Sequence, residues 1–173
     1  HTQNMQTFEG WLRYWNNVVI VSQCHSKEIR ISQHKDIYGV LLPVITNKYL
    51  NVAYFTFLGL FKIKQLNAKY DFDIYQASDA GGAILALIAS KIYGKKFVFE
   101  VQGDIFDYPS HVGGKVHSSL VKFFSEMIVK KADYIRIVSP FLYEPLDRFG
   151  INREKIFLVP PRCDSTLFSE KNV

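Results

Sequence analysis

Short apolar runs alternate with longer stretches of helical spacing along most of the chain. Five runs have strand character, at residues 18–21, 38–44, 73–77, 97–101 and 134–138. Short strands separated by helical stretches are typical of βαβ units and of a parallel sheet. We therefore predict an α/β fold with a doubly wound, mostly parallel sheet of the Rossmann-like kind.

Two of the intervening stretches predict long helices. Residues 82–93 are apolar on nearly every side and stop before Gly94, a residue type that often closes helices in the left-handed conformation. Residues 115–131 carry one apolar stripe that we expect to cover a face of the sheet, made of Val116, Leu120, Phe123, Phe124 and Met127.

A third helix is predicted after the run at 134–138. Ser139 is a good N-cap and Pro140 suits the first helical position, while Gly150 lies beyond the expected end. Pro145 falls inside this stretch and should kink or shorten the helix, because proline lacks a backbone N–H.

Residues 49–64 are rich in aromatic side chains. The segment is too short and too polar to span a bilayer, which needs about 20 apolar residues. We expect a helix packed on the sheet, with Tyr54, Phe57 and Phe61 in the core. The alternative is attachment to a membrane surface, which the flanking lysines would assist: Lys48, Lys62, Lys64 and Lys69.

Small or polar residues follow three of the strands directly. Open α/β sheets bind their ligands at the carboxyl ends of strands, so these residues are expected to rim a crevice. The candidates are Asp79, Gln102, Gly103, Asp104 and Ser139, together with Gly81 and Gly82 at the start of the following helix.

The last apolar run, residues 156–159, stops at a double proline and is followed by Arg162. A charged residue between a proline and a strand end has little structural reason to be there, so Arg162 is a further candidate for binding a ligand. The alternative is a simple ion pair with Asp164.

Several of these residues have an alternative structural role. Asp79 and Ser139 can serve only as helix N-caps. Gly81 and Gly82 fit neither a P-loop nor a dinucleotide fingerprint, although they let a ligand approach the backbone. Residues 104–118 are expected to form a loop over the crevice. Their aspartates and histidines lack the spacing of a zinc site, and we predict no metal there.

Composition narrows the functional classes. With 48% hydrophobic and 21% charged residues, the 173-residue chain has the make-up of one globular domain. Two cysteines without metal or disulfide spacing favour a reducing compartment such as the cytoplasm, and residues 1–15 lack the pattern of a signal peptide. The net charge of +5 favours anionic partners such as phosphorylated substrates, nucleic acid or an acidic membrane face.

Four segments, in order and at suitable spacing, carry a family resemblance. Residues 70–79, the strand 97–104, residues 130–139 with Glu126 before them, and residues 155–168 resemble segments of the amino-terminal domain of family 4 glycosyltransferases of the GT-B architecture. Gln102 stands where many members have histidine, and Pro161-Arg162 replaces an Asn-Gly pair. The chain opens inside the expected first helix, residues 3–15, and we expect it to lack the first strand and the C-terminal donor-binding domain.

The resemblance implies a retaining glycosyltransferase that moves a sugar from a nucleotide-sugar donor to a glycan or lipid-linked acceptor. It implies no metal or other cofactor, no nucleic-acid partner, and a cytoplasmic location with peripheral contact at the inner face of the membrane. Gln102 and Asp104 become catalytic candidates; the substrate-binding candidates are Asp79, Gly81, Gly82, Gly103, Ser139 and Arg162. This chain alone should be inactive. The alternatives are a GT-B sugar-nucleotide epimerase and a non-catalytic nucleotide- or sugar-binding module.

Overall fold

The computed structural model describes residues 12–103 and 114–160. They form two compact units. The first holds the chain up to Tyr75 together with Gly81–Lys95, and the second holds Gln76–Ala80 and the chain from Lys96 onward.

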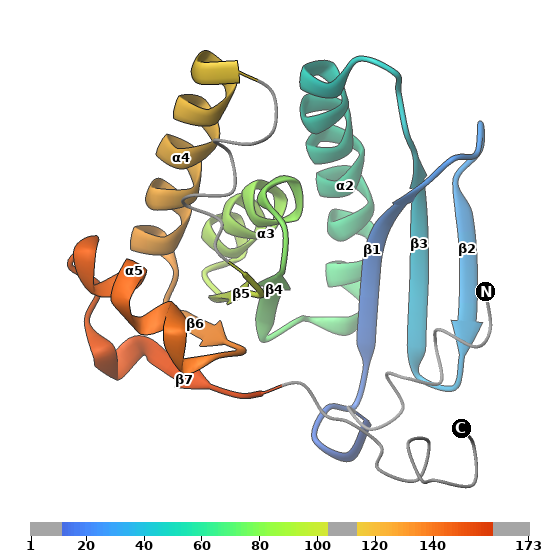
Figure 1. Ribbon diagram of the computed structural model, residues 1–173. Helices are drawn as coiled ribbons and strands as arrows, with labels where there is room; N and C mark the ends of the chain where they lie inside the picture. The colour runs from blue at the N-terminus through green and yellow to red at the C-terminus, as the bar shows by residue number, and fades with distance from the viewer. Residues whose placement is uncertain (1–11, 104–113, 161–173) are drawn as a thin grey trace, which may run out of the picture. The chain divides into compact units, whose positions relative to one another are not determined.

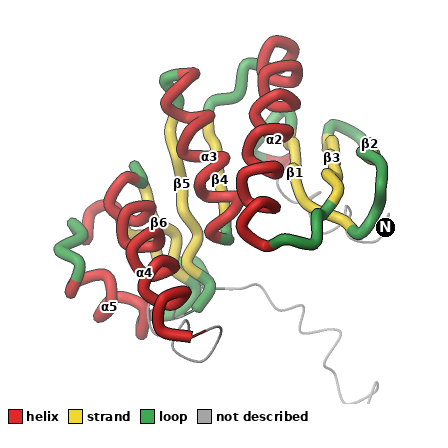
Figure 2. Tube along the Cα trace, turned by 90° about the horizontal axis from the view of Figure 1, so that it is seen from above, coloured by secondary structure: helices red, strands yellow, loops and turns green. Residues whose placement is uncertain are grey.

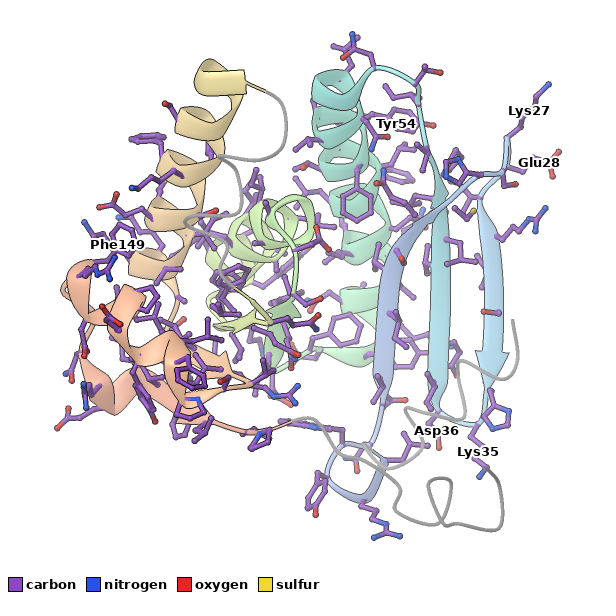
Figure 3. All side chains as sticks on the ribbon, viewed as in Figure 1. Lys27, Glu28, Lys35, Asp36, Tyr54 and Phe149 are labelled. Atoms are coloured by element: carbon purple, nitrogen blue, oxygen red, sulfur yellow. The ribbon has the colours of Figure 1, made fainter. Side chains whose placement is uncertain are left out.

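The first unit contains a three-stranded sheet and two helices. The sheet has the order β1–β3–β2 (Figure 1), in which β1 pairs with β3 in parallel and β2 pairs with β3 antiparallel. The elements are β1 (Val18–Cys24), β2 (Arg30–His34), β3 (Ile37–Pro43), α2 (Lys48–Tyr70) and, after β4, α3 (Ala80–Tyr93). The hairpin between β2 and β3 turns at Lys35, whose φ is 53°, with Asp36 beside it (Figure 3).

Each helix of this unit is followed by a residue in the left-handed conformation. Asp71 takes a φ of 45° after α2. After α3, Gly94 takes the predicted left-handed conformation with a φ of 65°, and the N–H of Lys95 donates to Ser90 O at 2.9 Å. This hydrogen bond is the one expected of a Schellman motif.

Close packing of α2 against α3 depends on a glycine. Gly59 of α2 is buried, and a Cβ built on it would stand 2.5 Å from Leu85 Cδ2 of α3. Helix α2 also lies along the sheet, in contact with β3 (Figure 2). The core of this unit consists of residues from β1, β3, α2 and α3: Val18, Ile37, Val40, Leu42, Phe55, Ile63, Ala83, Leu85 and Ala89.

Residues 49–64 are helical as predicted, but two of the three expected core positions are wrong. Phe57 is 72% exposed and Phe61 is 55% exposed, while Tyr54 is half-buried on α2 (Figure 3). The side chains that enter the core are instead Phe55 and Ile63, on another side of the helix. No helix in the described part of the chain is long and apolar enough to cross a membrane.

The second unit is built on a four-stranded sheet in the order β4–β5–β6–β7, whose β5–β6 and β6–β7 ladders are parallel. Its elements are β4 (Ile74–Ala77), β5 (Lys96–Val101), α4 (Gly114–Lys131), β6 (Tyr134–Ile137), a 3₁₀ helix (Pro140–Leu142), α5 (Tyr143–Arg148), a second 3₁₀ helix (Arg153–Lys155) and β7 (Ile156–Leu158). One face of β5 and β6 is fully apolar and buried, with Phe97, Phe99, Val101, Ile135 and Ile137.

The expected stripe of α4 is wrong at Phe123 and Phe124, while Met127 is half-buried and the side chains of Val116 and Leu120 lie outside the described part of the structure. Phe123 is 63% exposed and Phe124 is 39% exposed. Among the side chains of α4 that the structure describes, the buried ones are Ser125, Ile128 and Val129. In the described C-terminal part of α4, Ile128 and Val129 rather than Phe123 and Phe124 enter the core.

The third predicted helix is confirmed in its details. Ser139 Oγ accepts from the N–H of Phe141, and Pro140 begins a 3₁₀ turn. Pro145 lies in the first turn of α5, which is only 6 residues long, and Gly150 closes the segment with a φ of 69°. The missing N–H of proline thus limits the helix to a short, composite form.

Candidate functional site

The sheet of the second unit carries a polar face opposite its apolar one. Side chains alternate along a strand, so Glu100 and Gln102 point away from the buried face that holds Val101. In the parallel register Glu100 lies beside Arg136 of β6, which therefore projects from the same face. This face leads to the carboxyl ends of the strands.

Glu100 is the centre of this polar face. It is buried, with 8% exposure, and both of its carboxylate oxygens accept hydrogen bonds. Oε2 accepts from Gln76 Nε2 and from Arg136 Nη1, each at 2.8 Å, and Oε1 accepts from Gln102 Nε2 at 2.9 Å. A buried carboxylate needs such partners, and here they come from three neighbouring strands or strand ends.

Arg136 extends the network toward β7. Its Nη1 forms an ion pair with Glu100, and its Nη2 donates to the backbone oxygen of Val159 at 3.4 Å. The N–H of Val159 in turn donates to Ile137 O at 2.9 Å. Arg136 Nε is buried and has no hydrogen-bond partner among the described residues.

Gln102 and Gly103 occupy the position that the sequence predicted, directly after β5, and both are exposed. Position 103 does not require a glycine within the described structure. Its φ is not positive, and nothing lies within 4 Å of where a Cβ would stand. The absence of a side chain there leaves the backbone open to a ligand.

Asp79 and Ser139 follow β4 and β6, so the sheet brings the residues after three neighbouring strands to one edge. Asp79 is exposed and stands at the N-cap position before α3. Ser139 is half-buried and caps its own 3₁₀ turn, which is the structural role weighed above. Gly81 and Gly82 lie in the first turn of α3 and belong to the first unit.

The remaining candidates fall outside the described residues. These are Asp104 and Arg162, together with the residues of the expected loop up to position 113. In the part of the chain that is described, no group of three or more His, Cys, Asp and Glu side chains is placed to hold a metal ion.

Sequence reasoning missed Gln76, Glu100 and Arg136. A signal was present, because a glutamate and an arginine each interrupt an apolar strand, and charged residues inside strands are seldom buried without a partner. Glu100 and Arg136 are partners in the parallel register of β5 and β6, so knowledge of that register would have identified the pair.

The matching family model is that of Glycosyltransferase Family 4, over residues 4–166. The chain belongs to glycosyltransferase family 4. No curated protein sequence matches it.

Solved structures agree on the fold. Sucrose-phosphate synthase from Thermosynechococcus elongatus is similar with a TM-score of 0.74 at 12% identity, over 95% of this chain and 44% of the synthase. HepE from Anabaena, solved in complex with UDP, has a TM-score of 0.54 at 11% identity, over 88% and 46% of the two chains. A glycosyltransferase from Rickettsia africae has a TM-score of 0.53 at 16% identity, over 92% and 47%.

The chain spans less than half the length of these three structures. Its α/β fold is that of the amino-terminal domain of a family 4, GT-B glycosyltransferase, as the sequence resemblance predicted.

Proposed function

We propose that this chain is the acceptor-side domain of a retaining glycosyltransferase that moves a sugar from a nucleotide-sugar donor to a hydroxyl of a glycan or a lipid-linked acceptor. The family match over residues 4–166 carries the proposal. The polar edge at the carboxyl ends of β4, β5 and β6 supports it, because that edge can orient an acceptor against a donor.

The donor would be held mainly by the other domain of the complete protein. Gln102, Gly103, Asp79 and Ser139 would position the acceptor, and Gly81 and Gly82 would lie near a bound ligand at the start of α3. Asp104 and Arg162 complete the proposed set. Transfer would need no metal, with backbone amides and basic side chains stabilising the leaving diphosphate.

The deciding experiment uses the complete protein. It is incubated with a panel of nucleotide sugars, with and without simple glycoside or lipid-linked acceptors, and donor consumption is followed together with the anomeric configuration of the product. Acceptor-dependent consumption with retained configuration is expected. Donor epimerised in the absence of any acceptor would favour the epimerase, and binding without turnover would favour the non-catalytic module. Full activity in the presence of a chelator is expected from the metal-free proposal.

The isolated chain should neither transfer sugar nor bind a nucleotide sugar tightly. Calorimetry with the same nucleotide sugars is expected to detect no submicromolar binding. Tight binding to the 173-residue chain would contradict the assignment of the donor to the other domain.

Gly103 provides a sharp test of the proposed acceptor edge. Gly103→Ala meets nothing within the described structure, so the melting temperature should not change. If an acceptor approaches this backbone, the added methyl group should lower turnover.

Gln102→Ala and Asp104→Asn test the neighbouring polar side chains of the same edge. Each should lower turnover by more than about tenfold, the scale for losing a positioning or proton-handling group. Normal turnover in all three variants would remove this edge from the site.

We further propose peripheral attachment to an anionic membrane through α2. The observation that favours it is the exposure of Leu50, Phe57 and Phe61, which are 60%, 72% and 55% exposed at a spacing of seven and four residues along one face. Lys62 and Lys64 adjoin this stripe, and each basic residue near an anionic leaflet contributes about 1 kcal/mol.

Vesicle co-sedimentation tests the attachment. The protein should bind vesicles containing phosphatidylglycerol in a salt-sensitive manner and should not bind phosphatidylcholine vesicles. Phe57→Ser with Phe61→Ser should abolish binding, whereas Phe123→Ser, which changes an exposed aromatic of α4, is the matched control and should bind normally. No binding at low salt would refute the attachment.

A further inference from the structure

Gln102 is held in one orientation by Glu100. A carboxylate only accepts hydrogen bonds, so the 2.9 Å contact with Glu100 Oε1 must involve the amide nitrogen of Gln102 rather than its oxygen. The carboxylate cannot turn away easily, because its other oxygen is held by Gln76 and Arg136. The amide oxygen of Gln102 therefore faces away from Glu100 and has no partner among the described residues.

This orientation has a chemical consequence at the end of β5. Gln102 is exposed, so a ligand can reach its amide, while Glu100 is buried. An amide oxygen fixed in this way accepts a hydrogen bond from a ligand O–H or N–H.

We infer that Glu100 is a positioning residue that fixes Gln102 with its amide oxygen turned outward, so that this oxygen accepts a hydrogen bond from a hydroxyl group of the substrate. The inference rests on the proposed function for the identity of the hydroxyl, which is that of a sugar acceptor. The orientation of the amide can be tested without that function.

The first test observes the amide directly. In the ¹⁵N-labelled chain, the side-chain NH₂ signal of Gln102 is assigned by its loss in Gln102→Ala. Glu100→Gln is expected to shift that signal, because the new amide can donate as well as accept and no longer fixes its neighbour. Gln76→Ala removes one of the two donors to the other oxygen and leaves Arg136 to hold the carboxylate, so it is the matched control and should leave the signal in place. An unchanged signal in Glu100→Gln overturns the inference.

The second test measures the acceptor KM of the complete protein, with methyl glucoside, methyl galactoside and methyl mannoside as acceptor probes. Glu100→Gln should raise the acceptor KM by about threefold to tenfold, the fold-change of one neutral hydrogen bond, and should leave the donor KM unchanged. In the Gln102→Ala background, Glu100→Gln should have no further effect on the acceptor KM. An equal effect in both backgrounds would mean that Glu100 acts on stability alone and would overturn the inference. If the protein transfers no sugar to any probe, the proposed function fails, and the amide signal still decides the orientation.

Discussion

Gly59→Ala should destabilise the chain although alanine is the better helix former. Within a helix the exchange of glycine for alanine contributes about 1 kcal/mol of stability. Here the new Cβ would stand 2.5 and 2.9 Å from the two methyl carbons of Leu85 and 3.3 Å from its Cγ, against an optimal carbon–carbon separation of about 3.5–4.0 Å.

Leu85 has little room to move, since it is only 3% exposed. Overpacking of a core costs about 1–3 kcal/mol, so the helix propensity offsets only part of it. The expected net loss is about 1 kcal/mol, and at most about 2 kcal/mol.

Urea denaturation followed by circular dichroism measures this loss. Ala53→Gly on the exposed side of α2 is the control that calibrates helix propensity in the same helix, and it should cost about 1 kcal/mol. Leu85→Ala alone should cost about 2–5 kcal/mol, and combining it with Gly59→Ala should cost less than the sum, because the small side chain admits the new methyl group. A Gly59→Ala variant that is more stable by the full propensity gain would refute the close packing of α2 on α3.

Two further predictions concern single polar contacts. Tyr75→Phe should lower the free energy of unfolding by about 1 kcal/mol, because the buried hydroxyl of Tyr75 donates to Asn67 Oδ1 at 2.8 Å; an unchanged urea midpoint would contradict this. The hydrogen bond from Arg153 holds the pKa of Asp147 below its ordinary value of 3.8, so its stabilisation is complete above that pH and is lost as the pH falls through the lower, folded-state pKa. Asp147→Asn should therefore flatten the acid side of a urea-midpoint profile below about pH 4, and a profile parallel to that of the unchanged chain would count against the pair.

The fold was predictable because apolar periodicity and chain breakers are local signals. The strands at 97–101 and 134–138, the left-handed Gly94 and the cap at Ser139 all depend on neighbours within a few residues. Strand β2 was missed, because its five residues contain one apolar side chain, Ile31, and show no alternation.

The errors occurred where two choices satisfied the same local pattern. The sequence of α4 carries one stripe through Phe123 and Phe124 and another through Ile128 and Val129, and only packing selects between them. For the candidate site, the exposed strand ends were predicted from sequence, whereas the buried carboxylate that orients Gln102 was not. Its partners depend on strand register, which periodicity does not determine.

Strand β2 has a consequence for how this sequence can change over time. Four of the five side chains of β2 are exposed, whereas five of the seven residues of β3 are buried. Strand β2 therefore contributes mainly through the backbone hydrogen bonds of its pairing with β3. Selection on such a strand acts through the main chain rather than through residue identity. Among related proteins β2 should diverge faster than β3 while excluding proline at its paired positions.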